Sequence, residues 1–235
     1  MEKKQSVLAN IQIVLVEPRV PENIGLVARV LKNTGITNLS LVKPNLTVKA
    51  YEVAKRARDV LEGAKTYASL KEAVEDLYFV FGTTRRKSSD TFIFNFNGTK
   101  HLVASLASKK KVGIVFGRED FGLSQKEMEV CDGIFYLAAN PDFPSYNLAS
   151  CVTIVCYELM SLSEQLYHAP ALNLSSRQEY ETFFSYLKEY LAVQLKKNRV
   201  EPSLKTLKRL FLRTCLTKNE IALLKSLFIR HIRSL

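Results

Sequence analysis

The sequence predicts an α/β protein with a parallel sheet flanked by helices, followed by a small helical extension. Nearly continuous apolar runs alternate with helical stripes up to residue 169, and only helical patterns follow residue 170. A strand that is apolar along its whole length is typical of a parallel sheet buried on both faces. We therefore expect two domains, residues 1–169 and residues 170–235.

Each expected strand is a short apolar run, and each expected helix repeats apolar residues at intervals of three and four. Gly35 is expected to end the first helix, and Ser124 to cap a later one. The expected strands are 11–16, 38–42, 77–81, 112–116 and 134–137. The expected helices between and after them are 22–32, 49–62, 70–74, 101–107, 124–130 and 147–166. Ligands bind beyond the carboxyl ends of such strands, here near Gly82, Gly117 and 138–146.

Most of the net charge of +11 belongs to the C-terminal segment. Residues 1–169 hold 21 basic and 18 acidic side chains, a balance of +3, whereas residues 170–235 hold 13 and 5, a balance of +8. A basic segment is either a solvated helical face or a surface for a polyanion, and the concentration of charge at one end favours nucleic acid. The helices expected in this segment are 177–195, 203–213 and 217–233.

Composition and missing motifs exclude several classes of protein. No apolar stretch approaches the roughly 18 residues that span a bilayer, and the run 11–16 is too short for a signal peptide, so we expect a soluble cytoplasmic protein. The four cysteines have no C-x-x-C spacing and the three histidines are scattered, so we expect reduced thiols and no metal site. A dinucleotide-binding glycine motif, a phosphate-loop lysine and G-x-S-x-G are all missing.

Polar residues interrupt three segments near the expected strand ends. In the first, 21–29, a helix cap would explain Asn23 and a salt bridge would explain Arg29 as well as a ligand contact does. The second, 116–123, is a glycine-bounded turn whose charges could be no more than a solvated turn. In the third, 140–149, two prolines stiffen a loop that runs into a long helix. Such a loop presents backbone groups in fixed directions, which suits the edge of an adenine ring.

In order and spacing, these segments resemble the signature motifs of the SpoU-type branch of the SPOUT methyltransferases. The motifs read N-x-G-x-x-x-R, F-G-x-E-x-x-G-L and a proline loop that ends in N-L-A, and the resemblance spans residues 11–160. The basic helical tail, with 207–213 followed by the capping box of 217–220, also resembles the C-terminal extension of the TrmJ subgroup. That subgroup methylates the ribose of the first anticodon-loop nucleotide in tRNA, a C or a U.

The resemblance implies a C-terminal trefoil knot that forms the pocket for S-adenosylmethionine. It implies an obligate homodimer, with each site drawing groups from both subunits, and an enzyme that methylates the ribose 2′-oxygen of tRNA. Arg29 would be the principal catalytic residue, with Asn23 and Glu119 supporting it. The residues implied to line the cofactor pocket are Thr83, Thr84, Gly117, Leu137, Ser145, Tyr146 and Asn147.

The chemistry of the implied reaction can be argued from these residue types. Arg29 has been cast as the base in relatives, yet a guanidinium holds its proton with a pKa above about 12. We therefore expect Arg29 to stay charged, to grip the adjacent phosphate and to stabilise the developing alkoxide while Glu119 orients it. No cysteine falls in the three motifs, which disfavours methylation of a base carbon through a covalent cysteine adduct. Tyr146 stands where a small aliphatic residue is expected, and its ring could stack on a neighbour or narrow the pocket.

Two other functions stay open at this point. One is a 2′-O-methyltransferase acting on ribosomal RNA or on another tRNA site. The other is a non-catalytic RNA-binding protein on the same scaffold, against which the intact Asn23, Arg29, Glu119 and Asn147 speak.

Overall fold

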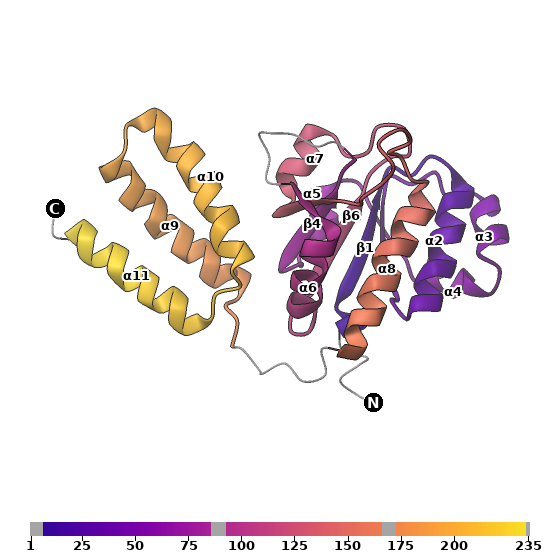
Figure 1. Ribbon diagram of the computed structural model, residues 1–235, viewed down its shortest axis with the longest axis horizontal. Helices are drawn as coiled ribbons and strands as arrows, with labels where there is room; N and C mark the ends of the chain where they lie inside the picture. The colour runs from indigo at the N-terminus through magenta and orange to yellow at the C-terminus, as the bar shows by residue number, and fades with distance from the viewer. Residues whose placement is uncertain (1–6, 86–92, 166–172, 234–235) are drawn as a thin grey trace. The chain divides into compact units, whose positions relative to one another are not determined.

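The computed structural model describes residues 7–85, 93–165 and 173–233, and the chain forms two compact units, Met1–Ala169 and Pro170–Leu235 (Figure 1). The division falls within a stretch that lies outside the described residues. The strands of the first unit are β1 (Ile11–Val16), β2 (Asn38–Val42), β3 (Lys65–Tyr67), β4 (Phe79–Thr83), β5 (Ile93–Asn95), β6 (Val112–Phe116) and β7 (Gly133–Tyr136). They form one parallel sheet in the order β3-β2-β1-β6-β4-β7-β5.

Helices cover both faces of this sheet, so the unit has three layers (Figure 1). The helices are α2 (Pro21–Thr34), α3 (Val48–Ala54), η1 (Lys55–Ala57), α4 (Arg58–Glu62), α5 (Leu70–Val74), α6 (Phe96–Ala107), α7 (Gln125–Val130) and α8 (Leu148–Gln165). Leu70 of α5 and Met128 of α7 pack on Val14 and Val80 of the sheet. On the other face, α8 lies between α2 and α6 and contacts both. The predicted parallel sheet flanked by helices is confirmed.

Several elements have the predicted bounds because local signals mark their ends. β1, β2, β6 and α5 begin and end at the predicted residues. Gly35 ends α2 in the left-handed conformation with φ 75°, and Ser124 caps α7 in a capping box, both as predicted. The sequence does not predict β3 and β5. Each is three residues long and lies at an edge of the sheet, so neither has a periodic apolar signal.

The prediction of one helix over 49–62 is wrong. Helical geometry breaks at Lys55, whose φ is 50° and whose N–H bonds to the carbonyl oxygen of Tyr51. The break keeps α3, η1 and α4 all in contact with α2. α3 packs tightly against α2 at Gly25, where an added Cβ would lie 2.3 Å from the carbonyl oxygen of Ala50. The motif glycine of α2 is therefore required by helix packing.

Several other bounds also differ from the predictions, among them those of β4, α6 and β7. β4 begins at Phe79, two residues late, because the N–H of Tyr78 still bonds to the carbonyl of Lys111 outside the strand. α6 begins at Phe96 and not at residue 101, because the side chain of Asn95 accepts a hydrogen bond from the N–H of Asn97 and caps the helix. β7 is shifted by one residue toward the N-terminus.

The second unit contains α9 (Arg177–Gln194), α10 (Lys197–Arg213) and α11 (Lys218–Arg233). Aromatic rings join the three helices, since Phe183 of α9 lies 5.0 Å from Phe211 and 5.9 Å from Phe228 between ring centroids. The hydroxyl of Tyr180 donates to the carbonyl of Phe211 at 3.1 Å and accepts from the N–H of Leu216 at 2.7 Å. These contacts give the unit its own small core.

Helix α10 begins six residues before the predicted start at residue 203. Pro202 lies inside the helix, although its ring removes one backbone hydrogen bond. A proline is usually found in the first turn of a helix, so the sequence predicts a start beside it. Val200 and Leu204 are both buried, so packing on either side of the proline holds the longer helix. The box of Thr217 and Glu220 caps α11 as predicted. Within the described ranges, none of the helices has the length and apolarity to cross a membrane.

Candidate active site

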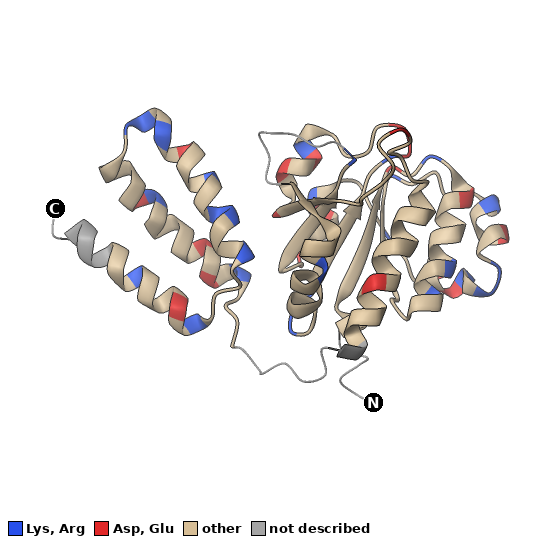
Figure 2. Ribbon diagram, viewed as in Figure 1, with Lys and Arg blue, Asp and Glu red and all other residues tan. Residues whose placement is uncertain are grey.

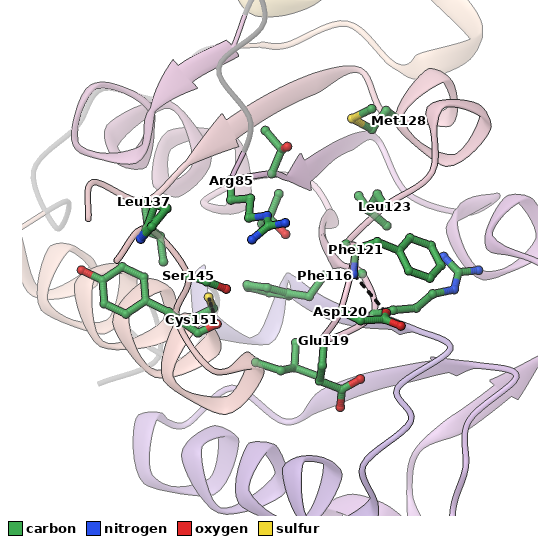
Figure 3. Close-up of a pocket in the computed structure, with 18 residues that line it drawn as sticks. Arg85, Phe116, Glu119, Asp120, Phe121, Leu123, Met128, Leu137, Ser145 and Cys151 are labelled. Carbon is green, nitrogen blue, oxygen red and sulfur yellow. Dashed lines mark hydrogen bonds between the residues drawn. The ribbon is translucent and has the colours of Figure 1, made fainter. Parts of the chain in front are cut away.

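A pocket lies beyond the carboxyl ends of β4, β6 and β7, in the central part of the sheet (Figure 3). In the view of Figure 3, Leu137, Ser145 and Cys151 lie on one side of it, Phe121 lies on the other, and Phe116 lies between. Because parallel strands end at the same edge, segments far apart in the sequence meet here. The lining residues are Thr83, Thr84, Arg85, Phe116, Gly117, Arg118, Glu119, Asp120, Phe121, Gly122, Leu123, Met128, Leu137, Pro144, Ser145, Tyr146, Leu148 and Cys151.

The sequence-predicted site residues divide into three groups. Glu119 lines the pocket, whereas Asn23, Asn147 and Arg29 are not among its lining residues. Asn23 and Asn147 instead contact each other beside the pocket, and Arg29 lies apart on α2. The predicted cofactor-binding residues that line the pocket are Thr83, Thr84, Gly117, Leu137, Ser145 and Tyr146.

Hydrogen bonds join Asn23, Glu119 and Asn147 in one polar cluster. The Asn23 Nδ2 atom donates to Glu119 Oε1 at 2.9 Å, and the Asn147 Nδ2 atom donates to Asn23 Oδ1 at 2.9 Å. Asn23 is the third residue of α2 and does not cap it, since Val20 holds the cap position. Asn147 also accepts from the N–H of Ala149 at 2.9 Å and thereby caps α8. The three sequence motifs therefore meet at this cluster.

The carboxylate of Glu119 is held ionised by its surroundings. Burial alone would raise the pKa of Glu119, but hydrogen bonds from Asn23 and from the backbone N–H groups of Arg19 and Val20 outweigh it and lower the pKa below its ordinary value. The backbone bonds measure 3.0 Å from Arg19 and 3.2 Å from Val20. Glu119 thus fastens the turn after β6 to the loop that precedes α2.

Arg29 lies outside this cluster in the single chain. Its side chain is exposed and has neither a hydrogen bond nor an ion pair with any described residue. Six residues of α-helix separate it from Asn23, which turns the two side chains about 120° apart around the axis of α2. The expectation that Glu119 orients Arg29 is therefore wrong for one chain, because Glu119 bonds to Asn23 and to the preceding backbone instead.

The turn after β6 needs both of its glycines. A Cβ on Gly117 would lie 2.2 Å from the carbonyl carbon of Gly122, so no side chain fits there. Gly122 has a φ of 73°, in the left-handed region. Two backbone bonds close the turn, from Arg118 N–H to the Gly122 oxygen at 3.2 Å and in the reverse direction at 2.9 Å. The backbone of this turn can therefore approach a ligand closely.

Arg118 is a structural residue that the sequence treats as part of a charged turn. Its buried guanidinium bonds to Glu127 through two nitrogens at 2.9 and 3.0 Å and to Glu17 through Nε at 2.9 Å. Burial would raise the pKa of Glu127, but the bonds from Arg118 and Ser124 outweigh it and lower that pKa. The pairs connect the turn to α7 and to the end of β1. The capping box of Ser124 and Glu127 is the one signal in the sequence that points to this arrangement.

We expect Arg118→Gln to lower the free energy of unfolding by about 3–5 kcal/mol at neutral pH, because it leaves two partly buried carboxylates without a cation. Since the folded pKa of Glu127 lies below its usual 4.5, its contribution is present above that value and is lost as the pH falls through the folded pKa. The difference between wild type and variant should therefore shrink below about pH 4.5. Urea unfolding across this pH range measures it.

Arg19→Gln is the matched control for this prediction. Arg19 pairs with Asp120 at the surface, where both side chains are about half exposed, so its loss should cost under about 1 kcal/mol. Equal losses in the two variants, or a loss in Arg118→Gln that is the same at all pH values, would contradict the role given to Arg118.

The remaining lining residues are mainly apolar, and most of them lie within the segments 116–123 and 140–149 that the sequence analysis identifies. Leu123 belongs to the F-G-x-E-x-x-G-L motif and Arg85 follows the Thr83–Thr84 pair, whereas Met128 has no local signal. Burial raises the pKa of Cys151 to about 11, so this thiol stays protonated and weakly nucleophilic at neutral pH.

The fold and the pocket define an α/β protein with a candidate ligand site at the carboxyl edge of a parallel sheet. Residues 10–157 match the SpoU rRNA Methylase family. A Haemophilus influenzae protein named as an uncharacterized tRNA/rRNA methyltransferase is 35% identical over 230 residues, which are 94% of this chain and 93% of that protein. The chain therefore belongs to the SpoU methylase family, as the motifs predict, and is an RNA methyltransferase.

Two relatives that carry the name TrmJ match over both units of the chain. The tRNA (cytidine/uridine-2′-O-)-methyltransferase TrmJ of an Escherichia coli strain is 31% identical over 236 residues, 94% of each protein. The crystal structure of TrmJ from Z. mobilis has a TM-score of 0.66 at 27% identity and covers 93% of this chain and 97% of its own. The similarity thus extends through the C-terminal helices.

Proposed function

We propose that this protein transfers the methyl group of S-adenosylmethionine to the ribose 2′-oxygen of tRNA, at the first nucleotide of the anticodon loop, a C or a U. The observation that carries the proposal is the cluster of Asn23, Glu119 and Asn147, which joins all three motifs at the wall of the pocket. The length over which the chain matches tRNA 2′-O-methyltransferases supports tRNA over other RNA substrates.

The residues of the pocket fit S-adenosylmethionine. Leu137 and Leu148 offer apolar contacts for an adenine ring, while Ser145 and the backbone of its loop offer hydrogen-bonding groups for the ring edge and the ribose. The lining also holds two carboxylates, Glu119 and Asp120, and two guanidinium groups, Arg85 and Arg118, so these four side chains carry no net charge together. When bound, this cofactor supplies a methyl group on a positively charged sulfur.

Arg29 is assigned to the reacting ribose. We expect its guanidinium to remain charged, to bind the phosphate beside the target nucleotide and to stabilise the alkoxide that develops as the 2′-hydroxyl loses its proton. Asn23 and Glu119 would act by holding the segment between β1 and α2 at a fixed distance from the pocket. Such positioning for in-line approach can contribute several kcal/mol to catalysis.

We further propose a homodimer in which Arg29 of one subunit serves the pocket of its partner. This accounts for an Arg29 that is exposed and lies outside the polar cluster of its own chain. The neighbouring helices α2 and α8 carry exposed apolar side chains, with Leu26 38% and Tyr157 57% accessible. A face of this kind suits a second copy of the chain.

We also propose that the chain is knotted at the pocket. β7 lies between β4 and β5, although both of these strands precede it in the sequence. The segment that leads into β7 therefore places this strand between two strands that come earlier in the sequence. This strand order supports a trefoil knot whose loops include the stretch from β7 to α8.

The second unit is proposed to bind tRNA. α10 carries basic residues along most of its length, and Figure 2 shows their positions along the ribbon in blue. One acidic residue, Glu201, lies among them and pairs with Lys188 of α9 at 2.6 Å. The basic residues of α10 and its cap are Lys196, Lys197, Arg199, Lys205, Lys208, Arg209 and Arg213.

The experiment that tests this function is mapping of the methylated nucleotide by mass spectrometry. Unmodified tRNA is incubated with the protein and methyl-labelled S-adenosylmethionine, and the digested products are sequenced. We expect one methyl group, on the ribose of the first anticodon-loop nucleotide, and no transfer when that nucleotide is 2′-deoxy. Methylation of ribosomal RNA fragments alone, or of another tRNA position, would support the alternative enzyme. RNA binding without cofactor binding would support the non-catalytic alternative.

A further inference from the structure

The loop between β7 and α8 is closed at its base by a tyrosine. The hydroxyl of Tyr146 donates to the carbonyl oxygen of Ala138 at 2.9 Å, across eight positions of the chain. Inside the loop, the carbonyl of Asn140 accepts from the N–H of Phe143 at 3.0 Å, and its side-chain oxygen accepts from the N–H of Asp142 at 3.0 Å. The loop therefore has a hydrogen-bonded turn at its tip, and the tyrosine hydrogen bond joins its two ends.

The closed loop forms a wall of the pocket. Leu137, the residue before Ala138, lines the pocket at the start of the loop, and Ser145 and Tyr146 line it at the end of the loop. Asn147 follows at once and is fixed by its bonds to Asn23 and to the first turn of α8. The hydroxyl of Tyr146 thus ties the end of the loop that carries Leu137 to the end that the polar cluster holds.

Tyr146 is not needed to fill the core. Its side chain is 41% accessible, and its backbone carbonyl rather than its ring faces the thiol of Cys151 at 3.9 Å. An exposed side chain with one specific hydrogen bond contributes little to global stability, so the bond must act locally. Its effect is to restrict the loop before any ligand binds, and a loop that is already ordered loses less entropy on binding.

We propose that Tyr146 is a positioning residue for the cofactor, whose hydroxyl closes the loop of residues 138–146 and fixes the pocket wall in its binding conformation. The inference rests on the proposed binding of S-adenosylmethionine in this pocket. It gives the tyrosine a role in place of the small aliphatic residue that the family motif leads one to expect, since an aliphatic side chain cannot donate this hydrogen bond.

Tyr146→Phe tests the proposal, because it removes the hydroxyl and keeps the ring. We expect the Kd for S-adenosylmethionine, measured by titration calorimetry, to rise roughly threefold to tenfold, the loss that one accessible hydrogen bond gives. The KM for the cofactor should rise by the same factor while kcat at saturation stays unchanged. Amide hydrogen exchange within residues 138–146 should be faster in the unliganded variant, and the Tm should stay within about 2 °C.

Two further variants sharpen the test. Tyr146→Leu, which carries the aliphatic type, should weaken binding at least as much as Tyr146→Phe. Tyr186→Phe on α9 is the matched control, since Tyr186 is half-buried in the second unit and has no hydrogen bond with the described residues. It should leave the Kd and the exchange of the loop unchanged.

The outcomes separate this inference from the proposed function. If Tyr146→Phe leaves the Kd for S-adenosylmethionine unchanged, the role of the hydroxyl is overturned, and the proposed methyltransferase function is unaffected. Tighter or faster binding by the variant also overturns it, because the hydroxyl would then obstruct the cofactor. A wild-type protein that does not bind S-adenosylmethionine contradicts the proposed function itself and this inference with it.

Discussion

Arg29→Ala is expected to lower kcat for methyl transfer by about 100-fold or more while changing the Kd for S-adenosylmethionine by less than about twofold. The guanidinium lies outside the pocket lining of its own chain, so its removal leaves the cofactor contacts in place. It would remove the one fixed positive charge assigned to the developing alkoxide. Single-turnover kinetics with tRNA measure the first effect, and calorimetric titration with the cofactor measures the second.

Arg29→Lys separates charge from geometry. Lysine keeps the positive charge but lacks the planar fork that binds a phosphate through two nitrogens, so we expect a loss of more than about tenfold. Substantial retained activity would argue against a need for the fork. Arg56→Ala, which removes another exposed arginine from the neighbouring η1, should leave kcat unchanged.

Mixed dimers locate the site in which Arg29 acts. Ser145→Trp places a large ring at an exposed position of the pocket wall and should block the cofactor in its own subunit without disturbing the core. If Arg29 serves the partner's pocket, a dimer of one Arg29→Ala and one Ser145→Trp subunit has one complete site. After random subunit exchange, about a quarter of the wild-type activity should return. No recovery above the parents would mean that Arg29 acts within its own subunit.

The parts of the fold that the sequence predicts are those marked by local signals. β1 and β6 are nearly continuous apolar runs, and each ends just before a residue that stops the pattern, Glu17 and Gly117. The convergence of the three motifs also follows from the sequence, because parallel strands with helical crossovers bring their carboxyl ends to one edge. The proximity of Asn23 and Asn147 can be predicted in this way, although 124 positions separate them in the sequence.

The contacts that the sequence does not reveal depend on the order of strands in the sheet. Arg118 and Glu17 meet because β1 and β6 are neighbours with Leu15 opposite Phe116, so each charged residue lies two positions past a paired one. No local sequence pattern predicts this register of β1 against β6. The bond from Tyr146 to Ala138 depends in the same way on the path of an irregular loop. The exposure of Arg29 depends on which side of α2 it occupies, and the proposed homodimer gives that exposure a function.

Removal of residues 170–235 is expected to abolish tRNA binding while leaving cofactor binding unchanged. The segment holds a balance of +8 against +3 for the rest of the chain, and binding to a phosphate backbone grows with the number of cations that contact it. The pocket and the polar cluster lie wholly in the first unit, which has its own core, so cofactor binding should survive. Fluorescence anisotropy with labelled tRNA and calorimetry with S-adenosylmethionine measure the two outcomes.

Substitutions on α10 test the same division without shortening the chain. Changing Lys197, Arg199 and Lys205 to Ala removes three exposed charges from the helix, and changing Lys49, Lys65 and Lys71 to Ala removes three from the first unit. Each lost phosphate contact lowers the slope of log Kd against log salt concentration by about 0.7 to 0.9. The slope should therefore fall by about 2 to 3 in the α10 variant and stay unchanged in the variant of the first unit. If both variants weaken equally, net charge alone drives binding. If tRNA affinity survives the deletion, the methyltransferase unit itself holds the RNA, and the anticodon loop would have to be recognised at the pocket edge.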